Sequence, residues 1–127
     1  MRLIWDADGK KYGAHDPTPE LIEELIEDLD NERRTMVALD VQGQCCLMVI
    51  GGQEGRVRVN FIPEDLNVAS QHLIDPDTGG ETIQLRMQGK LATYHIEHTV
   101  SKEIAIYALS EFVQSASLSA DLYWQQD

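Results

Sequence analysis

The residues with the most reactive side chains in this sequence are two cysteines and four histidines. Cys45 and Cys46 are adjacent within an apolar run, where a bond between them would close a strained eight-membered ring. We therefore interpret both cysteines as reduced residues of the core. Reduced cysteines agree with a reducing compartment and not with a secreted disulfide scaffold.

The histidines lack the spacing that metal sites need. His95 and Glu97 form a His-x-Glu pair, as in zinc deaminases, but that site also requires a later Pro-Cys-x-x-Cys, and no cysteine follows Cys46. Strand alternation places His95 and Glu97 on one face and His98 on the other. We therefore expect neither a metal nor a cofactor, and we interpret all four histidines as surface or hydrogen-bonded residues: His15, His72, His95 and His98.

Two acidic segments imitate known motifs without their context. Asp6-Ala7-Asp8-Gly9 has the spacing of the nucleophile motif of haloacid-dehalogenase-type phosphohydrolases, but the required βα units do not follow it. Asp75 to Gly80 imitates the start of a calcium-binding EF-hand loop, whose twelfth position is here Arg86 instead of an acid. We interpret the first segment as a solvated turn and the second as a turn rich in Asp and Gly.

Linear motifs of enzymes are otherwise absent. The sequence has no nucleophile elbow, no Walker loop and no dinucleotide fingerprint, and local context sets up no Cys-His or Ser-His pair. We therefore expect no enzymatic activity. A site assembled in space from distant residues stays an alternative, because such a site leaves no linear motif.

The charge balance is strongly acidic. Ten Lys and Arg residues stand against twenty-two Asp and Glu residues, which gives a formal net charge of −12. This charge repels free nucleic acid and anionic membranes and favours association with basic partners.

The longest apolar run, Cys45 to Ile50, is far shorter than the roughly 18 to 20 residues that cross a bilayer. The first residues do not resemble a secretory signal, so we expect a cytoplasmic protein.

The first third of the sequence predicts a hairpin and an acidic helix. Leu3 to Trp5 and Lys11-Tyr12 flank a segment with the composition of a hairpin turn. Thr18 is a typical N-cap with Pro19 at the first helical position, so a helix begins here. Its apolar stripe faces the sheet and its acids face outward; the stripe is Leu21, Ile22, Leu25, Ile26 and Leu29, and the outer acids include Glu20, Glu23, Glu24, Glu27 and Asp28.

The remaining sequence predicts strands and a second helix. Alternating apolar residues in three runs, around Val37 to Val41, Cys45 to Ile50 and Val57 to Phe61, predict an antiparallel meander with the middle strand central. Ile83 to Met87 and Tyr94 to Ile96 predict two further strands. Ser101 caps a helix whose inward stripe holds Ile104, Ala105, Ala108, Leu109, Phe112 and Val113, and residues 121–124 form a short last strand. The expected fold is α+β: a largely antiparallel sheet with two helices packed against it.

From about Val37 to Trp124 the sequence resembles the first immunity-protein family of bacterial polymorphic toxin systems. In that family a helix ending in Phe-Phe-x-Thr-Gly is followed by a Pro and a near-terminal Trp, and Phe112, Val113, Ser115, Ala116 and Trp124 occupy these positions here. Ala116 replaces the usual Gly, and Ser119 replaces the usual Pro. From their chemistry alone, Phe112 and Val113 are core residues and Trp124 is a large apolar plug at a strand end.

The resemblance implies a single immunity-protein-like domain over residues 1–127. Such a protein binds and neutralises a cognate toxin domain, often one similar to nucleic-acid deaminases, and an acidic inhibitor suits the basic substrate groove of such a toxin. The alternative is an acidic regulatory adaptor with another basic protein partner. The oligomeric state and the chemistry of the toxin stay open.

The candidate partner-binding residues are the exposed acids of two segments. Residues 1–32 hold ten acids and three bases, so the first helix is the densest acidic patch. A merely solvated helix face is the alternative interpretation of these acids. The candidates are Glu20, Glu23, Glu24, Glu27 and Asp28 on the helix, and Asp75, Asp77 and Glu81 in the later turn.

Overall fold

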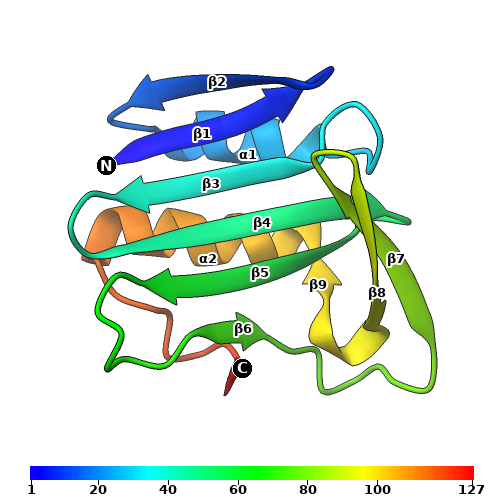
Figure 1. Ribbon diagram of the computed structural model, residues 1–127. Coiled ribbons are helices and arrows are strands. Elements are labelled where there is room, and N and C mark those ends of the chain that lie inside the picture. The colour runs from blue at the N-terminus through cyan, green and yellow to red at the C-terminus, as the bar shows by residue number, and fades with distance from the viewer.

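The computed structural model describes residues 1–127 and has an α+β fold (Figure 1). The main sheet is antiparallel, with the strand order β10-β6-β5-β4-β3-β1-β2 and a short strand β9 paired to β5. In chain order the elements are β1 (Arg2–Ala7), β2 (Lys10–His15), α1 (Pro19–Glu27), β3 (Met36–Val41), β4 (Cys45–Gln53), β5 (Arg56–Pro63), β6 (Gln71–Leu73), β7 (Thr82–Met87), β8 (Lys90–His95), the 3₁₀ turn η1 (Ile96–His98), β9 (Val100–Ser101), α2 (Lys102–Ser115) and β10 (Trp124–Gln126).

The predicted meander is confirmed. Strands β3, β4 and β5 follow one another in the sheet, and β4 lies between its two neighbours in the middle of the strand order. Successive side chains of a strand point to opposite faces of the sheet, and residues that pair across neighbouring strands point to the same face. One such row pairs Leu3 with Leu39, Leu39 with Leu47 and Leu47 with Phe61.

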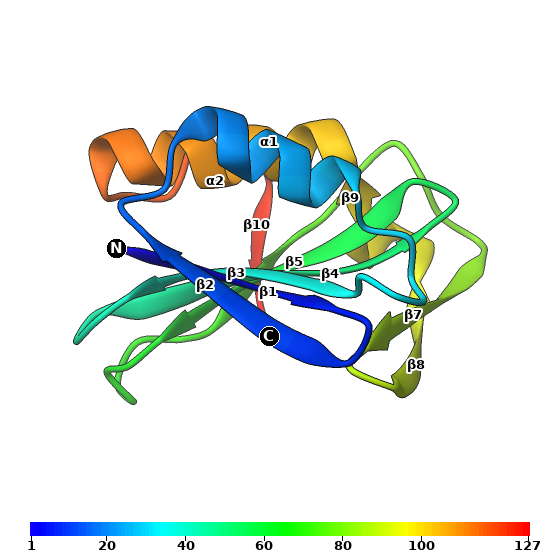
Figure 2. The same ribbon diagram turned by 90° about the horizontal axis from the view of Figure 1, so that it is seen from above.

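Both helices pack on the same face of this sheet, side by side (Figure 2). Each begins where the sequence predicts, because the Thr18 hydroxyl accepts a hydrogen bond from the Leu21 amide and the Ser101 hydroxyl accepts one from the Ile104 amide. The apolar stripes then meet the helix-facing rows of the sheet in one core, which includes Ile22, Ile26, Ala105, Leu109 and Phe112.

The opposite face of the sheet is covered only at one end, by the hairpin of β7 and β8 (Figure 2). These two strands form as the sequence predicts, but they pair only with each other and stay outside the main sheet. Gly51 allows the close approach: it has φ +104°, and a Cβ built there would lie 2.6 Å from Cδ2 of Leu85. Leu85 is buried as a result.

The first hairpin corrects one interpretation. Its turn is Asp8-Gly9, both with positive φ, and Asp6 belongs to strand β1 instead of a solvated turn. Asp6 is buried, and its carboxylate accepts hydrogen bonds from the amides of Thr35 and Met36 and from the Thr35 hydroxyl. A buried carboxylate is stable in the sheet only with such donors, so Asp6 anchors the start of β3.

Two further corrections concern the second half of the chain. The last strand begins at Trp124 instead of residue 121, and Ile96 starts the turn η1 instead of continuing a strand. The short strands β6 and β9 were not predicted; each has two or three residues, too few for alternation to show. Neither helix has the length and apolar character needed to span a membrane.

Candidate functional site

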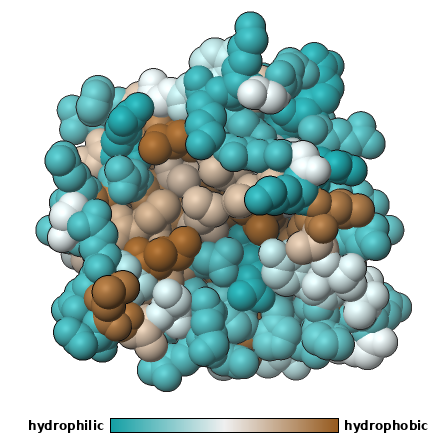
Figure 3. Space-filling model, in the orientation of Figure 1, coloured by the Kyte–Doolittle hydropathy of each residue, from teal (hydrophilic) through white to brown (hydrophobic).

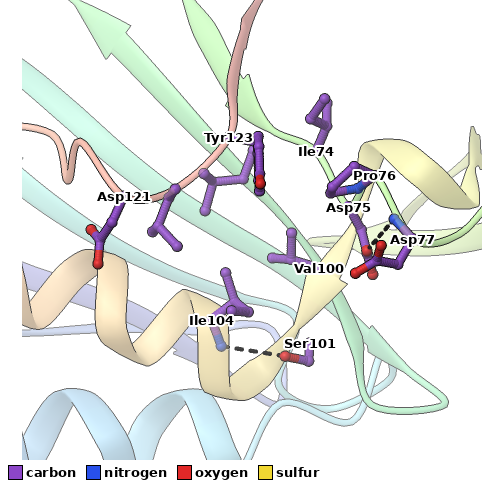
Figure 4. Close-up of a pocket in the computed structure, with 11 residues that line it drawn as sticks. Ile74, Asp75, Pro76, Asp77, Val100, Ser101, Ile104, Asp121 and Tyr123 are labelled. Atoms are coloured by element: carbon purple, nitrogen blue, oxygen red, sulfur yellow. Dashed lines mark hydrogen bonds between the residues drawn. The ribbon is translucent and has the colours of Figure 1, made fainter.

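A groove with a volume of about 380 Å³ lies where β6, the first turn of α2 and the segment before β10 meet (Figure 4). Its floor is apolar and includes Leu73, Val100, Ile104 and Leu122, while three carboxylates line its ends: Asp75, Asp77 and Asp121. We call this feature the acidic groove. An apolar floor between carboxylates suits a partner surface that is both apolar and basic.

The floor depends on a residue that the sequence places elsewhere. Ile104 was predicted in the inward stripe of α2, but its side chain lies in the acidic groove and it is 36% exposed. Tyr123 borders the same groove and is 62% exposed. Large apolar and aromatic side chains with this exposure gain most when a partner covers them.

Arg56 fixes one end of the acidic groove. Its guanidinium donates to an oxygen of Asp75 at 3.1 Å, and it also donates to the hydroxyl and carbonyl oxygens of Thr99. The Asp75–Arg56 ion pair is mostly shielded, with exposed side-chain fractions of 23% and 17%. Asp75 is therefore an anchor that holds the loop against β5, and its negative charge is largely compensated by Arg56.

Asp77 is the free carboxylate at this end. The other oxygen of Asp75 accepts a 3.1 Å hydrogen bond from the Asp77 amide, a turn typical of Asp-Pro-Asp sequences, which confirms the predicted turn (Figure 4). The Asp77 side chain is exposed and takes part in no ion pair. Of the two acids predicted here, Asp77 is therefore the one that can meet a basic partner directly.

Asp121 supplies the carboxylate at the opposite end. Ser119 donates a hydrogen bond to Oδ1, and the Tyr107 hydroxyl donates a 2.7 Å hydrogen bond to Oδ2. These two bonds, with Ser119 the larger effect, lower the pKa of Asp121 below its ordinary value. The carboxylate is thus held in one orientation and stays ionised at neutral pH.

The two ends are well separated. Figure 4 shows Asp121 at one end, Asp75 and Asp77 at the other, and Val100 and Ile104 between them. A partner that fills the acidic groove therefore has an aspartate on each side of an apolar contact, although the Asp121 carboxylate itself points away from Val100 and Ile104. This is the arrangement of a desolvated centre with a polar rim that is found in tight interfaces.

The first turn of α2 joins the acidic groove to the end of α1. Ser101 and Ile104 line the groove, and the intervening Lys102 donates hydrogen bonds of 2.8 and 2.7 Å to the carbonyl oxygens of Glu27 and Leu29. These carbonyls lie at the end of α1, where helices have unsatisfied acceptors and partial negative charge. Lys102 is therefore committed to this contact, and it forms no ion pair with an aspartate of the groove.

The candidate acids of α1 lie outside the acidic groove. Their side chains are exposed on the outer face, as predicted, and only Asp28 has a basic partner, Arg34, at 3.0 Å. Glu81 is also exposed, between the groove and β7, and lines no part of the groove. The structure thus brings together Asp75 and Asp77 and separates them from Glu81, Glu20, Glu23, Glu24, Glu27 and Asp28.

No family model and no curated protein matches this chain.

A second polar cluster escaped the sequence analysis. His72 is buried in β6, with Nδ1 2.6 Å from an oxygen of Asp127 and Nε2 2.8 Å from Nδ1 of His98. Since a carboxylate accepts, the neutral His72 ring donates from Nδ1 and accepts from His98 at Nε2. Burial lowers the pKa of His72 below its ordinary value despite the bond to Asp127. This confirms the interpretation of His72 and His98 as hydrogen-bonded residues.

The face of the sheet opposite the helices is partly apolar. One row of paired residues there runs from Ile4 through Ala38 and Met48 to Asn60 and His72. Figure 3, which views this face, shows apolar side chains across its middle with polar residues around them.

Cys46 also lies on this face and is half-buried, and burial raises the pKa of its thiol to about 11. Its thiol is therefore protonated and unreactive at neutral pH.

The residues that sequence reasoning missed at the acidic groove are Asp121, Tyr107, Tyr123 and Ile104. The sequence predicts a strand at Asp121 and Tyr123 and a core position for Ile104. Tyr107 lies outside the apolar stripe of the second predicted helix, but single aromatic residues are common on protein surfaces, so the sequence carried no specific signal for the groove.

Proposed function

We propose that this chain is an immunity protein that binds a basic toxin domain and neutralises it by covering the toxin's substrate site. The observation that carries the proposal is the acidic groove: an apolar floor with carboxylates at both ends, on a chain with a net charge of −12. The toxin is most simply a domain that acts on nucleic acid, such as a deaminase. It would be bound in the cytoplasm of the producing cell.

The physical basis is charge complementarity. A toxin that acts on nucleic acid needs a basic groove for its substrate, and a strongly acidic protein is attracted to that groove at long range. Such attraction mainly raises the association rate, so tight inhibition also needs a desolvated apolar contact. The acids of α1 fit the first role, and the acidic groove fits the second.

The resemblance to the immunity family gains support from the end of α2. Ala116 has φ 56° and ψ 28°, the left-handed conformation that favours glycine, and its amide donates to the Phe112 carbonyl at 2.8 Å. This is the position at which the family has Gly. Phe112 is buried, and Trp124 packs against the core with its indole N–H bonded to the Ser119 carbonyl. Ala116 thus adopts the backbone conformation that a glycine at this position would favour, which supports the proposal.

The test is co-expression with the toxin domain encoded next to this chain's gene. We expect the chain to restore growth to cells that express this toxin. The variant Asp77→Lys/Asp121→Lys should restore growth poorly at equal protein level, because the apolar contact would face basic side chains. A matched variant, Glu23→Lys/Glu24→Lys, changes the net charge equally, from −12 to −8, and should still restore growth.

Two results would argue against the proposal. If the chain binds the neighbouring toxin but leaves its activity intact, it is an adaptor and not an inhibitor. If growth is not restored and no complex forms, the basic partner of this acidic chain is a different protein.

A further inference from the structure

We propose that two copies of this chain form a dimer through the face of the main sheet that lies opposite the helices. The strands β4, β3, β1 and β2 are neighbours in this order, and the two-fold axis of the dimer runs along the strands between β3 and β1. Strand β1 of one copy then lies over β3 of the other, and β2 lies over β4. The helices of both copies point outward (Figure 2), and the inference does not depend on the immunity role.

The surface of contact, which we call the open face, consists of two rows of paired side chains. The hairpin of β7 and β8 bounds these rows at one end, where the Gln88 side chain contacts Sδ of Met36. From β2 to β4, the first row is His15, Arg2, Asp40 and Cys46, and the second row is Gly13, Ile4, Ala38 and Met48.

The second row is complementary to itself in size. The two-fold axis reverses the row, so Ile4 of one copy lies over Ala38 of the other, and Met48 lies over Gly13. Each large side chain therefore meets a small one, as in the interdigitated core of two packed sheets. Ile4 and Met48 are only half-buried in the single chain, so a second copy completes their burial.

The same axis makes the first row complementary in charge. It places Arg2 of each copy over Asp40 of the other, which gives two reciprocal ion pairs. Within one copy Arg2 and Asp40 are neighbours across β1 and β3, yet neither takes part in an ion pair. Both line a hollow of about 360 Å³ at this corner of the sheet. Both charges are therefore available to a second copy.

Arg2 must turn for the two contacts to form. In the single chain the end of its side chain lies against Gly13, because a Cβ built on Gly13 would lie 3.2 Å from both Nε and Nη2 of Arg2. Arg2 is exposed and has no ion pair to lose. When it turns to Asp40 of the second copy, it uncovers Gly13 for Met48 of that copy. The ion pairs and the apolar contact therefore form together.

Charge favours a second copy over a basic protein as the occupant of this face. The two rows hold one acid and one base, so the open face is neutral on a chain whose net charge is −12. A basic partner gains more from the acids of α1 and of the acidic groove, and a second copy is repelled by those acids. The open face is where two such acidic chains can meet.

The contact is small, so we expect a weak dimer. Strands about 4.8 Å apart and alternate residues about 6.8 Å apart give a region of roughly 20 by 15 Å. This size is at the lower end for specific interfaces, and we expect a dissociation constant on the order of 0.1 mM. Sedimentation velocity of the intact chain from about 10 μM to 1 mM measures it. The salt concentration is about 0.15 M, where screening limits repulsion between the two copies.

Exchange of the two charges is the decisive test. Arg2→Asp and Asp40→Arg have net charges of −14 and −10, because each changes the parent charge of −12 by two. Each variant alone places like charges opposite each other and should dimerise at least tenfold more weakly than the parent. An equimolar mixture should form a heterodimer at least as tightly as the parent dimerises, since opposite charges then meet at both positions. This heterodimer has the same total charge as the parent dimer, so long-range repulsion is matched.

Two variants of strand β2 test the match in size. Gly13 has no positive φ and lies on an edge strand, so the backbone accepts valine there. Gly13→Val should block Met48 of the second copy and weaken the dimer at least fivefold. The matched variant Ala14→Val adds the same branched side chain on the helix side of β2 and should leave the dissociation constant unchanged. Circular dichroism and thermal unfolding of each variant report whether its fold is intact.

The proposal is overturned if the parent remains a monomer at the highest concentration, or if the mixed charge variants associate no better than each variant alone. Dimerisation of Gly13→Val at the parent's strength also overturns it, because the copies then meet through another surface. A monomeric parent whose binding to the toxin domain is weakened by Gly13→Val and not by Ala14→Val would assign the open face to the toxin instead.

Discussion

The Tyr107 hydroxyl and the Asp121 carboxylate are joined by a 2.7 Å hydrogen bond that links α2 to the segment before β10. This bond lies at the edge of the acidic groove, and it fixes the orientation of the Asp121 carboxylate there. Since both residues are exposed, the bond contributes little to folding. Its main consequence is orientation, and orientation is what makes a charged contact selective.

The first prediction concerns the ionisation of Tyr107. The bond donated to Asp121 is the largest of the effects that raise the pKa of Tyr107 above its ordinary value of about 10. Asp121→Asn should therefore bring the pKa of Tyr107 back towards that value, and Tyr107→Phe should remove this ionisation altogether. Ultraviolet absorbance titration at alkaline pH measures both changes. Identical titration curves for the parent and Asp121→Asn would contradict the bond.

The second prediction contrasts two aspartates of the first hairpin. Asp6→Ala removes the acceptor for two buried amides and a buried hydroxyl, so it should lower the free energy of unfolding by about 3 kcal/mol or more. Asp8→Asn keeps a residue type that tolerates the positive φ of the turn, loses only the exposed ion pair of Asp8 with Arg33, and should leave that free energy nearly unchanged. Urea denaturation of both variants provides the comparison. Equal effects would mean that Asp6 is as solvated as Asp8.

The third prediction is a loss of stability in mild acid. Burial lowers the pKa of folded His72, so between that value and the ordinary value of about 6.5 the unfolded chain binds more protons than the folded protein. Stability therefore rises with pH in this window and is lost as the pH falls through it. The groups facing His72 are Asp127, which opposes the shift, and Arg58 and His98, which add to it.

A neutral replacement isolates this effect. His72→Gln should reduce the difference in the free energy of unfolding between pH 7.5 and pH 5.5, and the matched variant His15→Gln, at an exposed position of β2, should preserve it. Denaturant titrations at the two pH values measure both. A parent protein equally stable at both pH values would show that the folded state takes up the proton as readily as the unfolded chain.

The fourth prediction concerns Trp124. Its indole packs against the core and donates a 3.1 Å hydrogen bond to the Ser119 carbonyl, but it is only partly buried. Trp124→Ala should therefore lower the free energy of unfolding by about 2 to 3 kcal/mol, less than for a fully buried Trp. Tyr123→Ala, at the exposed neighbour, should change it little. Unchanged stability of Trp124→Ala with lost partner binding would instead make Trp124 a contact residue.

The elements with strong periodicity could be predicted from the sequence. Helix α1 has an N-cap at Thr18 and a stripe of apolar residues, and β3 to β5 alternate, so local preference and packing agree there. Strand β6 has three residues and β9 has two, and their pairing depends on tertiary contacts that no local pattern carries. The hairpin of β7 and β8 was predicted as strands, but its place outside the main sheet depends on the contact of Gly51 with Leu85.

The candidate site was predictable only in part. Asp75 and Asp77 were chosen for charge, and the structure separates their roles because Arg56, nineteen positions earlier, pairs with Asp75 alone. Asp121 and Ile104 carried no signal as site residues, since a lone acid near a Trp and an Ile in a helical stripe have ordinary structural interpretations. The acidic groove is formed by segments around residues 75, 101 and 121, and only folding brings these together.

The fifth prediction separates attraction from contact. Exposed charges outside an interface act mainly on the association rate, whereas charges at a desolvated contact also control dissociation. Two double variants have the same formal net charge of −8, because each replaces two acids by two bases in a chain whose net charge is −12. They are Glu23→Lys/Glu24→Lys on α1 and Asp77→Lys/Asp121→Lys in the acidic groove. Both should associate with the toxin domain more slowly than the parent at low salt. This difference should shrink as salt shortens the screening length to about 10 Å at 0.1 M.

The dissociation rate of these two variants from the toxin domain, measured by stopped-flow displacement, decides whether the acidic groove is the contact surface. The groove variant should dissociate at least tenfold faster than the parent, and the α1 variant should dissociate at the parent's rate. If the groove variant dissociates as slowly as the parent, the toxin does not contact the acidic groove. If the α1 variant alone dissociates faster, the contact surface is the outer face of α1.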